Sequence, residues 1–132
     1  MDSEIEKIIQ NSTFTIQEGK FVYAKVSEVP QMGHHFMVTK DAEEITVVTK
    51  EENLSGLALV ERNKDFYRLI ALNVSVPFYA VGFIATVSQA IARGGMNILI
   101  ISTYSKDYIM IREDRLEDAK TVLLKLGFKE RS

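Results

Sequence analysis

The stretch that decides the fold is Asn97–Ile111, which reads NILIISTYSKDYIMI. It opens on a nearly continuous apolar run, as is typical of an interior strand. The polar segment Thr103–Lys106 predicts a turn, and Asp107–Ile111 returns to the composition of a strand. We therefore expect a strand, a turn and a second strand in this stretch.

A helix is predicted on the N-terminal side of this stretch. The residues that recur at helical spacing are Val81, Ile84, Ser88 and Ile91. The pattern stops at Gly94-Gly95, where a glycine can adopt the left-handed conformation that ends many helices. The segment Ser75-Val76-Pro77 predicts a break between this helix and the strand before it.

A second helix is predicted on the C-terminal side. Asp114 is a candidate N-cap, and Glu117 follows it three residues later. The apolar stripe of this helix consists of Leu116, Ala119, Val122, Leu123 and Leu126. Gly127 closes the helix, and Phe128–Glu130 is expected to form a short last strand.

The order of elements from Phe66 onward indicates the fold class. Phe66–Val74 is rich in apolar residues and predicts a strand before the first helix. The predicted elements then follow the β-α-β-β-α-β order of ferredoxin-like folds. We therefore expect an α+β fold in which two helices cover one face of an antiparallel sheet.

The first half of the chain opens with a short helix and a predicted hairpin. Ser3 followed by Glu6 fits a capping box, which predicts a helix start. Phe14–Ile16 and Phe21–Val26 have strand-like composition, and Gly19 lies between them in a turn. We expect these strands to pair as a hairpin, with Gly19 at positive φ.

Two more strands follow in the first half. His35–Thr39 and Ile45–Lys50 are predicted as strands joined by a polar turn. Glu51–Gly56 is a polar break with room for a single helical turn. Because small sheets need a layer packed on one face, this half is a poor candidate for an independent fold.

Composition and charge exclude several classes of function. The chain has 132 residues and a net charge of −2, with Lys and Arg interspersed among Asp and Glu. Nucleic-acid binding is not expected, because it needs a concentrated basic surface. The absence of cysteine excludes disulfides, thiol nucleophiles and zinc sites that use Cys. With no stretch typical of a signal peptide or a membrane span, we expect a cytoplasmic protein without a membrane partner.

The junction between the strand ending at Val74 and the following helix is the first candidate site. A helix N-terminus presents unpaired N–H groups and a partial positive charge, which attract a carboxylate or a phosphate. Gly82 lets a ligand approach this backbone without a β-carbon in the way. The alternative is a plain strand-to-helix turn, and spacing alone favours that alternative.

The turn after the apolar run is the second candidate site. Asp107 could hold an ammonium or guanidinium group, with Ser102 and Thr103 as neutral hydrogen-bond partners. The alternative is ordinary hairpin-turn chemistry, in which Asp and Ser bond to their own backbone. Considered by its chemistry alone, the turn favours the alternative.

No constellation of catalytic or metal-binding residues is recognisable in the sequence. His34 and His35 are adjacent and would point to opposite faces of a strand, without a Cys or a third His to complete a metal site. Ser75 and Ser88 have no histidine in a recognisable motif, and no glycine-rich phosphate loop is present. We therefore expect a protein that is not an enzyme and uses no cofactor and no metal.

The stretch 74–128 resembles ACT-domain proteins, and among them the small two-ACT proteins related to the CASTOR arginine sensors. The motifs that carry the resemblance are Val81-Gly82-Phe83-Ile84-Ala85, Gly95-Met96-Asn97-Ile98, the run 101–109 with Ser102-Thr103-Tyr104 and Asp107, and the closing helix Leu116–Phe128. The first half is similar more loosely, at 18–22 and 44–48.

The resemblance implies a domain organisation and a ligand site. Residues 1–60 would be a degenerate, mostly β ACT-like half, and residues 61–132 would be the ACT domain. Proteins of this type bind an amino acid at the seam between domains. Carried onto this chain, the ligand carboxylate would meet the backbone of Val81, Gly82, Phe83 and Ile84, and its amine or side chain would face Thr103, Tyr104 and Asp107.

Two functions follow from these expectations. The first is a non-catalytic regulatory protein that binds an amino acid and forms a homodimer. The second is a dimeric ACT-like interaction module that has no metabolite ligand and docks on a partner enzyme. An RNA-binding protein of the same shape is disfavoured, because 98–102 and 108–112 lack the glycine–aromatic pattern of RNA-recognition strands.

Overall fold

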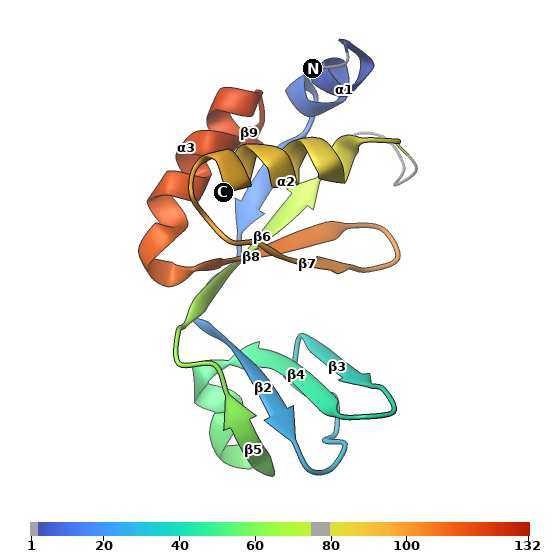
Figure 1. Cartoon of the computed structure of the whole chain (residues 1–132), viewed down its shortest axis with the longest axis vertical. Helices are drawn as coiled ribbons and strands as arrows, with labels where there is room; N and C mark the ends of the chain where they lie inside the picture. Colours follow the sequence, from blue (N-terminus) through green and yellow to red (C-terminus); the bar gives the residue numbers. More distant parts are fainter. Residues whose placement is uncertain (1–2, 75–79) are drawn as a thin grey trace. The chain divides into compact units, whose positions relative to one another are not determined.

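The computed structural model describes residues 3–74 and 80–132, so the predicted break at Ser75-Val76-Pro77 lies outside the described residues (Figure 1). The chain divides into two compact units, which differ from the expected halves 1–60 and 61–132. The first unit comprises residues 1–17 and 68–132, and the second comprises residues 18–67. The second unit is therefore an insertion within the first.

The first unit contains the predicted β-α-β-β-α-β order. Its elements are the helix α1 (Ser3–Gln10), the strand β1 (Thr13–Ile16), most of β6 (Tyr67–Asn73), α2 (Phe83–Arg93), β7 (Leu99–Ser102), β8 (Asp107–Arg112), the 3-10 turn η2 (Glu113–Arg115), α3 (Leu116–Leu126) and β9 (Lys129–Glu130). The glycines expected to end α2 and α3 do so, with Gly95 at φ 77° and Gly127 at φ 121°. The order predicted from residue 66 onward is thus confirmed.

Strand β1 joins the sheet of the first unit, whose order is β7-β8-β6-β1-β9. It pairs antiparallel with β6, where Phe14 lies opposite Leu72, and parallel with β9. The predicted hairpin between Phe14–Ile16 and Phe21–Val26 is wrong. Phe14 is completely buried in the core of the first unit, and this burial favours pairing of β1 with β6 and β9.

The core of the first unit lies between one face of the sheet and the helices. Figure 1 shows α2 and α3 together on one side of this sheet. The buried residues of the core are Ile5, Ile9, Phe14, Ile70, Leu72, Phe83, Val87, Ile91, Met96, Ile109, Ile111, Ala119, Leu123 and Phe128. Each large apolar side chain that is fully buried contributes about 1.5–3 kcal/mol, so this layer supplies the main stabilisation of the unit.

The second unit is an antiparallel sheet without an α-helix among its described residues. Its elements are β2 (Phe21–Val26), β3 (Met37–Lys40), β4 (Ile45–Lys50), the 3-10 helix η1 (Glu51–Gly56) and β5 (Leu59–Arg62), with the strands in the order β3-β4-β2-β5. The helical turn expected after Lys50 is present as η1, and Gly19 has the expected positive φ of 99°. Strand β5 was not anticipated, because its short sequence alternates weakly.

The start of α3 differs from the prediction. Asp114 lies in η2, and the helix begins after Arg115 without a side-chain cap. The carboxylate of Asp114 instead accepts a hydrogen bond from Arg112, 2.8 Å away. The ion pair with Arg112 therefore replaces the expected N-cap. Among the described helices, none has the length and apolar composition needed to cross a lipid bilayer.

Candidate functional site

The two predicted parts of the site lie at the same end of the first unit. Figure 1 shows the N-terminus of α2 and the turn between β7 and β8 together on the right of the view. Strand β7 is antiparallel to β8, and Ser102 is paired with Asp107 at the end of the ladder next to the turn. The sequence therefore brings its two candidate segments to one edge of the fold.

Gly82 gives the start of α2 its backbone geometry. It is the N-cap, with φ 89° and ψ −3°, and as a glycine it has no side chain of its own to cap the helix. Among the residues that the structure describes, none lies within 4 Å of a β-carbon built at Gly82. The first turn of any α-helix lacks intrahelical partners for its N–H groups, so a helix start of this kind can accept an anionic group.

The residues on either side of Gly82 have different roles. Val81 is 93% exposed, whereas Phe83 is buried and its ring meets that of Phe128 at a centroid distance of 6.0 Å. The N–H of Phe83 donates to the carbonyl of Ala80. Ile84 is partly buried against the core. Phe83 thus anchors the helix start and cannot offer its side chain to a ligand.

The turn between β7 and β8 is organised by its own polar groups. The hydroxyl of Ser102 donates to Oδ1 of Asp107 at 2.5 Å. The N–H of Thr103 donates to the carbonyl of Lys106 at 2.8 Å, and its hydroxyl lies 3.2 Å from the same oxygen. These bonds are the hairpin-turn chemistry of the alternative interpretation. A carboxylate accepts about four hydrogen bonds, so Asp107 retains capacity for a further donor.

Tyr104 stands at the tip of this turn and is 90% exposed. Ser102 is also exposed, and Asp107 is half-buried. Together these side chains offer an aromatic ring, hydroxyls and one negative charge at the end of the unit where α2 begins.

Asn73 was not among the predicted site residues, but it fixes the end of β6 that leads to the site. Its amide nitrogen donates to the hydroxyls of Thr13 and Thr15 at 3.1 and 3.0 Å. These bonds tie the end of β6 to β1, immediately before the junction that leads to α2. A lone polar residue at the end of an apolar strand was the available signal, but its partners lie about sixty residues away.

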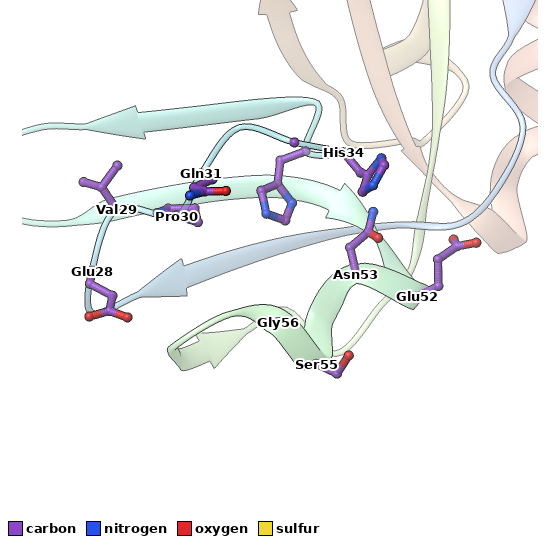
Figure 2. Close-up of a pocket in the computed structure, with 11 residues that line it drawn as sticks. Glu28, Val29, Pro30, Gln31, His34, Glu52, Asn53, Ser55 and Gly56 are labelled. Carbon is purple, nitrogen blue, oxygen red and sulfur yellow. The ribbon is translucent and has the colours of Figure 1, made fainter.

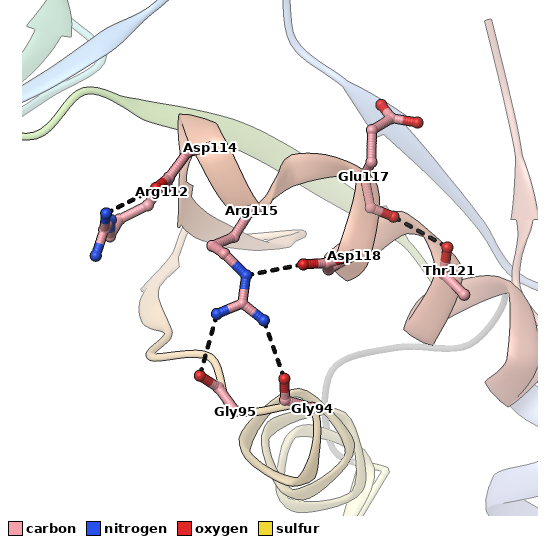
Figure 3. A network of polar contacts seen from close by, with 8 residues as sticks. All are labelled: Gly94, Gly95, Arg112, Asp114, Arg115, Glu117, Asp118 and Thr121. Carbon is pink, nitrogen blue, oxygen red and sulfur yellow. Dashed lines mark hydrogen bonds and ion pairs between the residues drawn. The ribbon is translucent and has the colours of Figure 1, made fainter.

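Arg115 holds the other end of α2 in place. Figure 3 shows its guanidinium between the carbonyls of Gly94 and Gly95 and the carboxylate of Asp118. The distances are 3.1 Å to Gly94, 3.3 Å to Gly95 and 2.8 Å to Asp118. A cation at the C-terminus of a helix interacts favourably with the helix dipole. The arginine thereby couples α3 to α2, which in turn positions Gly82.

The second unit carries a hollow of about 600 Å³ (Figure 2). It lies between the loop 27–36 and η1, and both His34 and His35 line it. Nδ1 of His35 is 2.9 Å from the hydroxyl of Thr49. Within residues 3–74 and 80–132, no three His, Asp or Glu side chains are grouped so as to hold a metal ion.

Comparison with known proteins places the fold. Residues 64–125 match the model of a family described as ACT domain. A search of curated proteins found no match. A solved protein of unknown function from Vibrio cholerae, described as a possible transport protein, is 21% identical with a TM-score of 0.78, covering 95% of this chain and 97% of that one.

Two further solved structures share the architecture. A protein from Agrobacterium tumefaciens is 17% identical, with a TM-score of 0.70 and coverage of 91% and 92%. The regulatory subunit of aspartate kinase from Thermus thermophilus, in a ligand-free form, is 12% identical, with a TM-score of 0.63 and coverage of 86% and 95%. The chain therefore has the mixed α+β, ferredoxin-like ACT fold.

Proposed function

We propose that this chain is a regulatory, non-catalytic protein of the cytoplasm whose first unit binds an amino acid. The observation that carries the proposal is the start of α2 at the N-cap Gly82, which lies at the same end of the unit as the Ser102–Asp107 turn and has no described residue within 4 Å of a β-carbon built there. The match of residues 64–125 to the ACT domain family and the likeness to a regulatory subunit of aspartate kinase support it. The relation to the CASTOR sensors stays a prediction from the sequence.

The two parts of the site suit the two charges of an amino acid. The ligand carboxylate would accept hydrogen bonds from backbone N–H groups in the first turn of α2 other than that of Phe83, which already donates to Ala80. The ligand ammonium would lie against Asp107, whose carboxylate Ser102 already orients. Thr103 and the exposed ring of Tyr104 would border the ligand side chain. Each group thus serves binding, and none of these roles needs a nucleophile or a base.

Calorimetry of the full chain against each of the twenty amino acids tests the proposal. One or a few of them should bind and raise the unfolding temperature, since a ligand at a hundred times its Kd stabilises by about 2.7 kcal/mol. Asp107→Asn should weaken that binding about tenfold, because the amide keeps the acceptor for Ser102 but removes the charge. Glu61→Gln, an exposed carboxylate of the second unit, is the matched control and should leave it unchanged.

A dimeric interaction module without a metabolite ligand is the second candidate. It is favoured by the exposed apolar side chains of the edge strand β5, since Leu59 is 44% and Val60 is 56% exposed. If none of the twenty amino acids binds at millimolar concentration, and the chain forms a stable complex with a partner enzyme, this function is supported over the first. In both cases we propose that two copies of the chain associate about a two-fold axis.

A further inference from the structure

The hollow of the second unit has the size of a small-molecule site. Its volume of about 600 Å³ falls within the range of about 300–1,000 Å³ that is usual for ligand pockets. One wall is the loop 27–36 and the other is η1, as Figure 2 shows. We propose that this hollow binds a small organic cation, an ammonium or guanidinium group carried on an aliphatic chain.

The lining of the hollow carries negative charge. The eleven lining residues include the carboxylates of Glu28 and Glu52 but no lysine and no arginine. Among the described residues, neither carboxylate has a hydrogen-bond or ion-pair partner. A concave surface with one sign of charge concentrates ions of the opposite sign. The hollow therefore attracts cations and repels carboxylates and phosphates.

A buried hydroxyl joins the two walls and carries the second step. Thr49 is completely buried, and its Oγ1 accepts a hydrogen bond from Nδ2 of Asn53 at 3.1 Å. The same hydroxyl lies 2.9 Å from Nδ1 of His35. Asn53 belongs to η1 and His35 to the loop, and both line the hollow. The walls are thus held together before a ligand arrives, which lowers the entropy cost of binding.

The arrangement of the lining narrows the class of ligand. Glu28 and Glu52 come from opposite walls and lie at opposite ends of the labelled set in Figure 2. Val29 and Pro30 add apolar surface to the loop wall. A chain of a few methylene groups suits the apolar part, and a terminal ammonium suits either carboxylate. This site lies in the second unit, and it does not depend on amino-acid binding at Gly82.

An NMR titration of the full chain with 1,4-diaminobutane tests the proposal. The backbone amides of 28–35 and 52–56 should shift and saturate, while those of 81–85 stay in place. Butane-1,4-diol has the same length without the charges and should shift none of them. A lack of saturation at 20 mM diamine, or equal shifts with the diol, would overturn the proposal.

Variants that remove one charge distinguish a direct ion pair between the diamine and a lining carboxylate from a general attraction to an acidic surface. At least one of Glu28→Gln and Glu52→Gln should raise the Kd for the diamine about fivefold, near the upper limit for an exposed ion pair. Glu51→Gln removes the same charge from the neighbouring exposed residue, which does not line the hollow, and should change the Kd less than twofold. Equal weakening by all three variants would show a diffuse acidic surface and contradict the site.

Discussion

At the scale of single residues, one glycine decides the shape of the proposed site. Gly82 adopts a left-handed backbone immediately before α2, and Phe83 secures the next position by burying its ring against Phe128. The backbone is thereby turned and fixed at adjacent residues. No described residue crowds the position of a β-carbon at Gly82, so its positive φ is the reason the structure gives for a glycine there.

Replacing Gly82 by alanine should destabilise the protein by about 1–2 kcal/mol, because an L residue is strained at φ 89°. Gly56→Ala is the matched control, since its β-carbon also meets nothing within 4 Å and its φ is not positive. Urea unfolding of both variants measures the difference. Equal stabilities of the two variants would contradict the strain at Gly82.

A second residue-scale prediction concerns the pair of Lys120 and Glu130. The hydrogen bond that the Lys120 ammonium donates to the Glu130 carboxylate, 3.0 Å away, and the negative charge of that carboxylate raise the pKa of Lys120 above its ordinary value of 10.5. Because the folded-state pKa is the higher one, the contribution of the pair is complete below pH 10.5 and is lost as the pH rises through the folded-state pKa. In an NMR titration, Glu130→Gln should lower the pKa of Lys120. An unchanged pKa would show that the pair does not form in solution.

At the scale of elements, the positions of α2 and β1 depend on contacts between segments far apart in the chain. Arg115, just before α3, binds the carbonyls at the end of α2. Asn73, on β6, binds the threonines of β1. One contact holds the far end of α2, and the other holds the strand that leads to its start. The proposed site therefore depends on contacts that local sequence patterns do not reveal.

Arg115→Lys should lower the stability by about 1–2 kcal/mol, because a lysine ammonium cannot reach both carbonyls and Asp118 in the planar geometry of a guanidinium. Arg93→Lys alters an exposed arginine at the end of α2 and should be nearly neutral. Thermal unfolding compares the two. An Arg93→Lys variant as unstable as Arg115→Lys would contradict a specific role for the clamp.

Truncating the side chain of Phe14 on β1 should destabilise the first unit more than the second. Phe14→Ala should cost about 3–5 kcal/mol, since it empties a fully buried position between β6 and the helices. Native-state hydrogen exchange should show the loss at β6, α2 and α3. Loss of protection confined to β2 and β4 would support the hairpin that the sequence suggested.

Hydrophobic periodicity was sufficient to predict most of the elements but not all of their pairings. The spacing of apolar residues predicts the helices α2 and α3 and the strands β7 and β8. Each of them is present near its predicted bounds. The partner strand of β1 could not be predicted, because the composition of Thr13–Ile16 is equally compatible with pairing to β2 and with pairing to β6. Pairing is decided by the burial of Phe14, which depends on the whole unit.

The candidate site was predictable to a similar extent. Glycine at a helix start and a polar turn are local signals, so Gly82 and Asp107 could be proposed as site residues, and they stay a prediction. The burial of Phe83 could not be predicted, because the sequence at the start of this helix does not show which face packs against the core. The hollow of the second unit gave no usable signal, since it is formed by two segments that meet only in the fold.

At the scale of the whole molecule, the chain is an ACT-type unit interrupted by a smaller β unit. We predict a dimer, so light scattering at micromolar concentration should give twice the chain mass of 15.0 kDa. A clean mass of 15.0 kDa would contradict the dimer.

The most direct test of the central claim is to map the bound amino acid on the backbone of the full chain. In an NMR titration with each of the twenty amino acids, at least one should produce saturable shifts. The account predicts that the largest changes fall on the amides of 82–85 and 102–107. Saturable shifts confined to other segments, or no saturable shift with any amino acid at millimolar concentration, would contradict it.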